Sequence, residues 1–175
     1  DEIRQFVYED DLDDVKRIWK EVGWVDDEHG AQQLDHFFAT GETLLATVNG
    51  KPECSVHTVS ADMQIHESVI SALAVTAVTT SHLGRGRAFA QRLTAQQLIR
   101  AQREGCGLSV LGMFDQGFYD KLGFGTGSYE REFVIDPGTL MVPVPRRTAI
   151  RLTVADYEEM HDCLMKRCRQ HGSVS

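Results

Sequence analysis

The part of the sequence that most constrains the fold is an apolar run, residues 69–78, followed by a glycine-rich turn and a long helical pattern. The run predicts a β-strand, the turn at residues 84–87 reads Gly-Arg-Gly-Arg, and the helix is expected over Gly86–Glu104. Glycines let the backbone approach a ligand closely, and the free N–H groups and dipole of a helix N-terminus favour an anion. Two interpretations stay open: a phosphate cradle, or a purely structural connection.

The segments around this turn predict a mixed sheet. Thr43–Val48 and Pro52–Ala61 read as strands joined at Asn49-Gly50, a strong type I′ hairpin signal, and Glu67–Val78 completes an antiparallel meander. Leu108–Met113 is expected to run parallel to the strand before the turn, because a helix connects the two. His57, in the middle of the second strand, is interpreted as a half-buried sheet residue rather than a catalyst.

The N-terminal part predicts a strand over Ile3–Tyr8 and two helices. Asp10 or Asp11 is expected to cap the first helix. Asp26 and Asp27 are expected to cap the second, which buries an apolar stripe formed by Ala31, Leu34 and Phe38. Trp24 stands beside these acids between the helices, so Trp24 and Asp26 are either an amine-binding pair or parts of a capped helix start.

The C-terminal part predicts a boundary near its prolines. Gly125–Ile135 reads as a strand that completes a first domain over residues 1–136, and residues 137–147 form a proline-containing linker. Residues 148–175 then read as a strand over Thr148–Val154 and a helix over Asp156–Gln170, two elements that the first domain does not obviously need. One strand and one helix bury too little apolar surface to fold alone. We therefore expect them to dock on the first domain or on a second copy, as a homo-oligomer.

Charge and composition restrict the partners. The formal net charge is −8, which disfavours nucleic acid and anionic membranes and favours a cationic ligand. No apolar run approaches the roughly 20 residues of a membrane span. The four cysteines form no C-x-x-C pair and the histidines no H-x-x-x-H pair, so we expect reduced thiols, no metal site and a cytoplasmic location.

A second motif follows the expected parallel strand. Residues 118–124 read Phe-Tyr-Asp-Lys-Leu-Gly-Phe, about 30 residues after the glycine turn. Together the two motifs resemble those of the GCN5-related N-acetyltransferases (GNAT), over residues 1–136. The resemblance implies an α/β GNAT fold. This fold has a mixed central sheet with an antiparallel N-terminal meander and a parallel pair at the acyl-CoA site, and helices flank the sheet. The resemblance also implies acetyl-CoA as the co-substrate.

The resemblance also implies which residues hold that co-substrate. The backbone at the end of the strand would bind the pantetheine arm, and the turn amides would hold the pyrophosphate. Leu83 departs from the family's usual Arg or Gln, which should weaken the grip on the phosphates; Arg85 and Arg87 either supply charge or are simply solvated. The implied cofactor-binding residues are Ala77, Val78, Thr79, Leu83, Gly84, Arg85, Gly86, Arg87 and Ala88.

Tyr119 stands at the family's general-acid position, where it would protonate the departing thiolate. The alternative is a core tyrosine packed on Phe118 and Leu122. Within the superfamily the motifs are most similar to the enhanced-intracellular-survival (Eis) type, whose general base is the carboxylate at the C-terminus of a longer chain. That type continues into a second domain, and residues 148–175 resemble the start of that domain, cut short. Here only Asp26, Glu28 or His82 would stand in for that base, through water.

The resemblance predicts an acetyl-CoA-dependent N-acetyltransferase that acts on a primary amine. Acceptors of the Eis type include aminoglycosides and lysine side chains, and the acidic chain suits such polycations. The acceptor-binding residues are expected to include Trp24 and Asp26. Two alternatives stay open: an acyl-CoA-binding module without turnover, and a module that mainly mediates oligomerisation.

Overall fold

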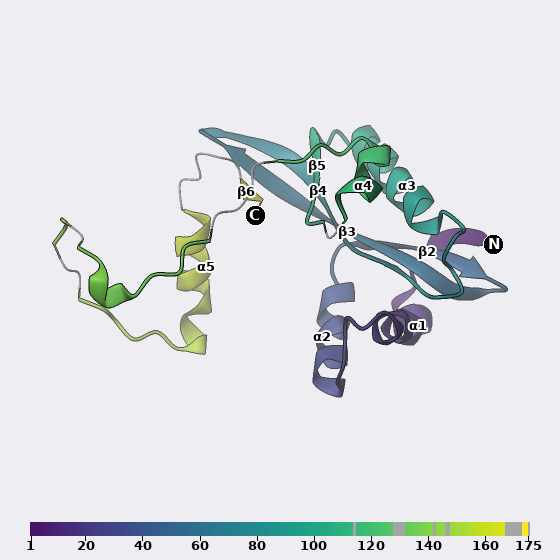
Figure 1. Cartoon of the computed structure of the whole chain (residues 1–175), viewed down its shortest axis with the longest axis horizontal. Helices are drawn as coiled ribbons and strands as arrows, with labels where there is room; N and C mark the ends of the chain where they lie inside the picture. Colours follow the sequence, from purple (N-terminus) through teal and green to yellow (C-terminus); the bar gives the residue numbers. More distant parts are fainter. Residues whose placement is uncertain (114, 128–131, 142, 146–147, 167–172, 175) are drawn as a thin grey trace. The chain divides into compact units, whose positions relative to one another are not determined.

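The computed structural model describes residues 1–113, 115–127, 132–141, 143–145, 148–166 and 173–174. The chain divides into two compact units, Asp1–Phe124 with Arg169–Ser175, and Gly125–Cys168. The first unit contains a mixed β-sheet covered by helices (Figure 1).

The sheet of the first unit has the strand order β1-β2-β3-β4-β5. Its strands are β1 (Glu2–Gln5), β2 (Glu42–Val48), β3 (Lys51–Ile65), β4 (Ser68–Thr80) and β5 (Leu108–Leu111). Neighbours from β1 to β4 pair antiparallel, and β4 pairs parallel with β5. The predicted meander and parallel pair are therefore confirmed. A short strand, β6 (Ser173–Val174), also pairs antiparallel with β3.

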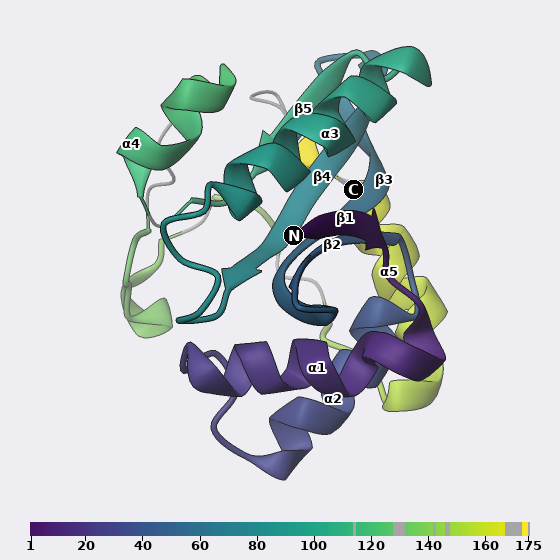
Figure 2. The same cartoon turned by 90° about the vertical axis from the view of Figure 1, so that its right-hand side faces the viewer.

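Helices cover both faces of this sheet (Figure 2). Helix α3 (Phe89–Arg103) packs on one face through Phe89 and Leu93, which join a core cluster with residues of β2, β3 and β4. Helices α1 (Tyr8–Glu21) and α2 (Glu28–Phe38) build a second cluster on the other face. The second cluster contains the predicted stripe of α2, Ala31, Leu34 and Phe38. The sheet thus separates two apolar cores.

The start of α1 differs from the prediction. β1 ends at Gln5 and α1 begins at Tyr8, without a side-chain cap, so neither Asp10 nor Asp11 caps it. Asp11 is instead buried and accepts two hydrogen bonds of 2.6 Å from Arg4 and one of 2.8 Å from the Val7 amide. The bonds from Arg4 hold the pKa of Asp11 below its usual range. This aspartate therefore fastens β1 to the first turn of α1.

At the start of α2, Asp27 is the cap and accepts a 2.7 Å hydrogen bond from the Gly30 amide. Asp26 precedes it and is exposed. Of the two aspartates expected to cap this helix, only Asp27 has that role.

In the second unit, the two predicted strands are wrong for the residues that the structure describes. Residues 125–127, 132–135 and 148–153 form no strand, and 128–131 lie outside the described residues. Thr153 and Asp156 form a capping box, so helical structure begins at η3 (Val154–Asp156) and continues into α5 (Tyr157–Met165). The predicted end of this helix, 167–170, also lies outside the described residues. A strand needs a partner for its backbone groups, and no described strand pairs with these segments.

His57 is fully buried on the face of β3 that carries α1 and α2, at 0% exposure rather than half-buried as predicted. The rings of Phe37 and Phe38 lie 4.7 and 5.4 Å from its ring, and Thr43 Oγ1 lies 2.7 Å from its Nδ1. Its Nε2 has no hydrogen-bond partner among the described residues. Burial lowers its pKa from 6.5 to about 4, so the imidazole is neutral in the folded state.

This burial predicts acid sensitivity of the fold. Between pH 6.5 and about 4 the unfolded chain binds a proton at His57 that the folded chain does not. The contribution of neutral His57 to the free energy of unfolding is therefore complete above pH 6.5. It falls by about 3 kcal/mol as the pH drops toward 4. We expect His57→Gln to flatten the fall of the unfolding free energy over this range, measured by urea titration. The exposed His36→Gln is the control; equal slopes for both variants would contradict the assignment.

Candidate functional site

The site begins with an irregularity in β4. His57 pairs with Thr76 and Ser55 pairs with Thr79, so β4 carries one residue more than β3 over this stretch. Ala77 adopts a left-handed conformation (φ 49°) there. This is a β-bulge, and it exchanges the two faces of the strand. Ala77 packs into the cluster of α1 and α2, and Val78 packs against the cluster of α3.

Beyond the bulge, β4 loses its neighbour on one side. The ladder between β4 and β5 runs from the pair Ala72↔Leu108 to the pair Val75↔Leu111. Within the described part of the chain, residues 76–80 have no ladder partner on that edge. Backbone donors and acceptors at the end of β4 are therefore available to an extended ligand.

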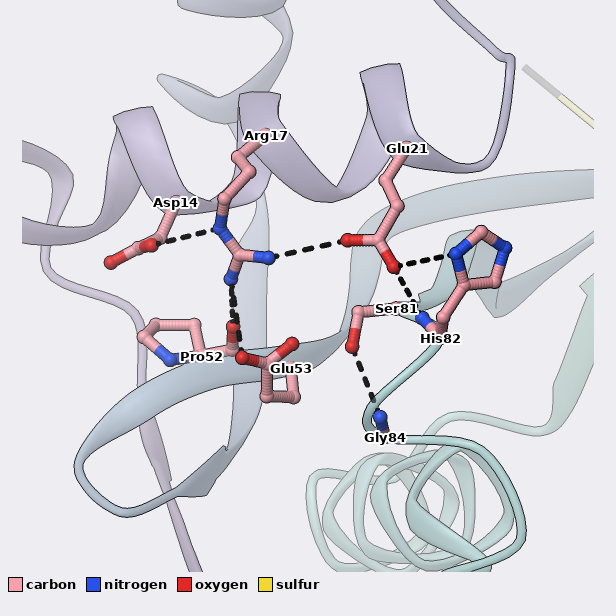
Figure 3. A network of polar contacts seen from close by, with 8 residues as sticks. All are labelled: Asp14, Arg17, Glu21, Pro52, Glu53, Ser81, His82 and Gly84. Carbon is pink, nitrogen blue, oxygen red and sulfur yellow. Dashed lines mark hydrogen bonds and ion pairs between the residues drawn. The ribbon is translucent and has the colours of Figure 1, made fainter.

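The turn after β4 is anchored at its first residue. Ser81 is buried; its amide donates to the Glu53 carbonyl at 2.9 Å, and its Oγ accepts a 3.0 Å hydrogen bond from the Gly84 amide (Figure 3). Gly84 must be glycine for a steric reason, because a Cβ there would lie 2.6 Å from the Glu53 carbonyl oxygen. The start of the turn is thus packed tightly against β3.

The later part of the turn is open. Gly86 has φ +75° and Ala88 has φ 54°, and these left-handed residues delay the start of α3 to Phe89 instead of the predicted Gly86. Among the described residues, the amides of Arg85, Gly86 and Arg87 donate no hydrogen bond. A Cβ on Gly86 would meet no atom within 4 Å. Unpartnered amides before a 15-residue helix form a suitable site for an anion.

The charged and apolar side chains of the turn differ in their surroundings. Leu83 is exposed at 72% and Arg85 lines the cavity described next. Arg87 Nη1 lies 3.1 Å from an Asp1 carboxylate oxygen, so part of its charge is already compensated. Arg85 is accordingly the better-placed cation for a phosphate.

A cavity of about 320 Å³ opens where β4 and β5 separate. Its wall brings together Trp24, Val78, Thr79, Arg85 and Tyr119 from the predicted site residues. Asp26 is not part of this wall. The wall also contains residues that were not predicted: Val22, Thr80, Ala90, Asp115 and Phe118. For Asp115 the only available signal was its position three residues before the motif that begins at Phe118.

Tyr119 reaches this cavity from a short helix, α4 (Gln116–Tyr119). Asp115 caps α4 by accepting a 2.9 Å hydrogen bond from the Gly117 amide. The rings of Phe118 and Phe124 lie 4.9 and 5.9 Å from the Tyr119 ring. Burial raises the pKa of Tyr119 above its ordinary value of 10.0, so its hydroxyl stays protonated at neutral pH and is able to donate a proton.

The described residues contain no cluster of His, Cys, Asp or Glu that would hold a metal ion. Cys54, Cys106 and Cys163 are free thiols, and burial raises the pKa of Cys54 to about 11, which makes it a poor nucleophile. No helix in the described ranges has the length and apolar character needed to cross a bilayer. The wall of the cavity itself carries the Tyr119 hydroxyl and the charged side chains of Arg85 and Asp115.

Residues 2–127 match the family described as acetyltransferase (GNAT) domain. Because this match covers well over half of the chain, the chain belongs to the GNAT acetyltransferase family. No curated protein matches it significantly.

Solved structures share the fold at low sequence identity. A putative acetyltransferase from Agrobacterium tumefaciens is 19% identical, with a TM-score of 0.61 over 77% of this chain and 100% of that one. Eis1 from Mycobacterium abscessus is 18% identical, with a TM-score of 0.62 over 73% of this chain but 32% of its own. A GNAT family acetyltransferase from Brucella melitensis, solved in complex with acetyl-CoA, is 18% identical (TM-score 0.56; 71% and 82% covered). The predicted GNAT fold is confirmed.

Proposed function

We propose that this chain is an acetyl-CoA-dependent N-acetyltransferase acting on a primary amine. The observation that carries the proposal is the cavity where β4 and β5 separate, because its wall contains the open strand edge at Val78 and Thr79 together with Tyr119. Family membership supports the acyl donor.

The residues at this cavity fit acetyl-CoA. The open edge of β4 from Ala77 to Thr79 would hydrogen-bond the amide groups of the pantetheine arm, as an added strand does. The unpartnered amides from Arg85 to Arg87 would hold the pyrophosphate at the start of α3, with Arg85 adding a positive charge. Leu83 offers neither charge nor a hydrogen bond, so backbone amides would carry most of this contact.

Acetyl-CoA would supply the acetyl group as a thioester. The amine nitrogen forms a bond to the acetyl carbon, the carbon–sulfur bond breaks, and the proton lost by the amine passes to solvent. Tyr119 Oη would give its proton to the departing sulfur and recover one from solvent. Because burial raises the pKa of Tyr119, its hydroxyl still carries this proton when the carbon–sulfur bond begins to break.

The acceptor would enter beside Trp24 and Val22, which follow α1 on the cavity wall. Asp115 is the carboxylate of that wall and suits an ammonium group, and the net charge of −8 favours cationic acceptors. We extend the proposal to an aminoglycoside-like polycation or a lysine side chain. Asp26, which is exposed and follows Trp24 by two residues, would contact the distal part of such an acceptor.

Coenzyme A binding tests the proposed site. We expect a dissociation constant in the micromolar range by calorimetry, and at least about tenfold weaker binding for Gly86→Asp, because a carboxylate would repel the pyrophosphate. The matched control is Gly105→Asp. Both glycines have positive φ and no atom within 4 Å of a built Cβ, but Gly105 lies beyond the other end of α3. Absence of binding, or equal weakening by both substitutions, would contradict the assignment.

Tyr119→Phe tests the general acid. The substitution keeps the ring packing but removes the proton, so we expect kcat to fall about 10²–10⁴-fold with little change in KM for acetyl-CoA. The assay follows free thiol released with a panel of primary amines that includes an aminoglycoside and a lysine peptide. Tyr8→Phe, which removes a hydroxyl bonded to the Asp35 carbonyl, is the control. An unchanged rate would leave Tyr119 with a packing role only.

A further inference from the structure

The last residue of α1, Glu21, touches the turn that follows β4 (Figure 3). Its Oε1 accepts a hydrogen bond of 2.5 Å from the His82 amide and lies 3.1 Å from His82 Nδ1. One carboxylate oxygen therefore contacts both the backbone and the side chain of His82.

The other oxygen of Glu21 is held by Arg17, one turn earlier in α1. Arg17 Nη1 lies 3.3 Å from Glu21 Oε2, and Nε lies 3.2 Å from Asp14 Oδ1. The guanidinium also donates a 2.6 Å hydrogen bond to the Pro52 carbonyl, at the start of β3 (Figure 3). Glu21 is thus fixed from both sides, with one oxygen on the turn and one on Arg17.

The position of Glu21 is unfavourable for the helix itself. A carboxylate in the last turn faces the negative end of the helix dipole. Arg17 compensates for this charge, and His82 donates a hydrogen bond to the same carboxylate from its backbone amide. Proteins break such local preferences mainly at functional or strained sites, so Glu21 is a candidate for a role at the turn that it contacts.

The network ends in the first half of the turn, just before the proposed phosphate-binding amides. Ser81 is tied to β3 and His82 to α1, so two successive residues of the turn are fixed from different elements. The unpartnered amides of residues 85–87 follow a few positions later. The cavity wall contains Val22, which directly follows Glu21. It also contains Thr80, which lies two residues before His82.

We infer that Glu21 is a positioning residue that sets the turn for the phosphate groups of coenzyme A. The inference rests on the proposed function. Because Glu21 contacts the turn and not the edge of β4, its loss should weaken binding of the phosphate-bearing part of the ligand and spare the pantetheine arm. A general loss of stability would weaken both parts alike.

The test compares two ligands on three variants of the full chain. The ligands are coenzyme A and pantetheine, which lacks all phosphates; their dissociation constants are measured by calorimetry and by NMR titration respectively. Glu21→Ala removes the contact, Glu21→Gln keeps an acceptor for the His82 amide without the charge, and Asp13→Ala removes an exposed acid from the same helix as control. Alanine favours helix, so Glu21→Ala is expected to fold.

For Glu21→Ala we expect coenzyme A to bind about tenfold more weakly, the equivalent of one hydrogen bond to a charged group, and pantetheine to bind as to the wild type. Glu21→Gln should recover most of the loss, and Asp13→Ala should bind both ligands normally. Amide hydrogen exchange at His82 should accelerate in Glu21→Ala.

Equal losses for both ligands, or unchanged coenzyme A binding in Glu21→Ala, would overturn the inference while the proposed function stands. A wild-type chain that binds neither ligand would overturn the proposed function and this inference with it.

Discussion

The backbone at Ala77 is the constraint on which the rest of the site depends. A non-glycine residue in the left-handed region costs roughly 1–2 kcal/mol, and here it sits inside the longest antiparallel pairing of the sheet. The extra residue sends Ala77 into one core and Val78 into the other, so packing on both faces holds the bulge in place. The ladder with β5 stops just before it. The strain is thus located where β4 exposes its edge to the cavity.

The turn after β4 shows a similar division between rigid and open parts. Its first half is fixed by Ser81, by the close approach of Gly84 to β3, and by the contact from Glu21. Its second half keeps unpartnered amides and left-handed residues before α3 begins. A rigid anchor next to free donors lowers the ordering cost of binding an anion, which is the physical content of preorganisation.

Local signals in the sequence were sufficient for much of the fold. The Asn49-Gly50 pair forms the predicted turn, with φ 51° and 80°, and the spacing of Ala31, Leu34 and Phe38 identified the buried face of α2. These features depend on neighbours within one turn or one hairpin. Tyr119 was predicted from the family resemblance and Trp24 from its acidic neighbours, and the structure places both in one cavity wall.

What the sequence did not predict depends on distant contacts or on competition between them. Asp11 is a residue type that commonly caps helices, but here the Arg4 guanidinium of β1 binds both of its carboxylate oxygens. Glu21 and His82 meet across 61 positions of the chain, which no periodicity reveals. Residues 148–153 have the composition of a strand but no described strand to pair with, and apolar side chains of that unit such as Val154 are 88% exposed.

The central claim is that the open edge of β4 and the turn after it form one continuous binding site for acetyl-CoA. Mapping of backbone amide chemical shifts on addition of acetyl-CoA tests it directly, because each part of the site reports separately. The account predicts that the largest changes fall on residues 77–79, on 84–88 and on Tyr119, while the distant hairpin end of β3 and β4 stays unchanged. Changes concentrated elsewhere, or confined to the turn with the strand edge unaffected, would contradict it.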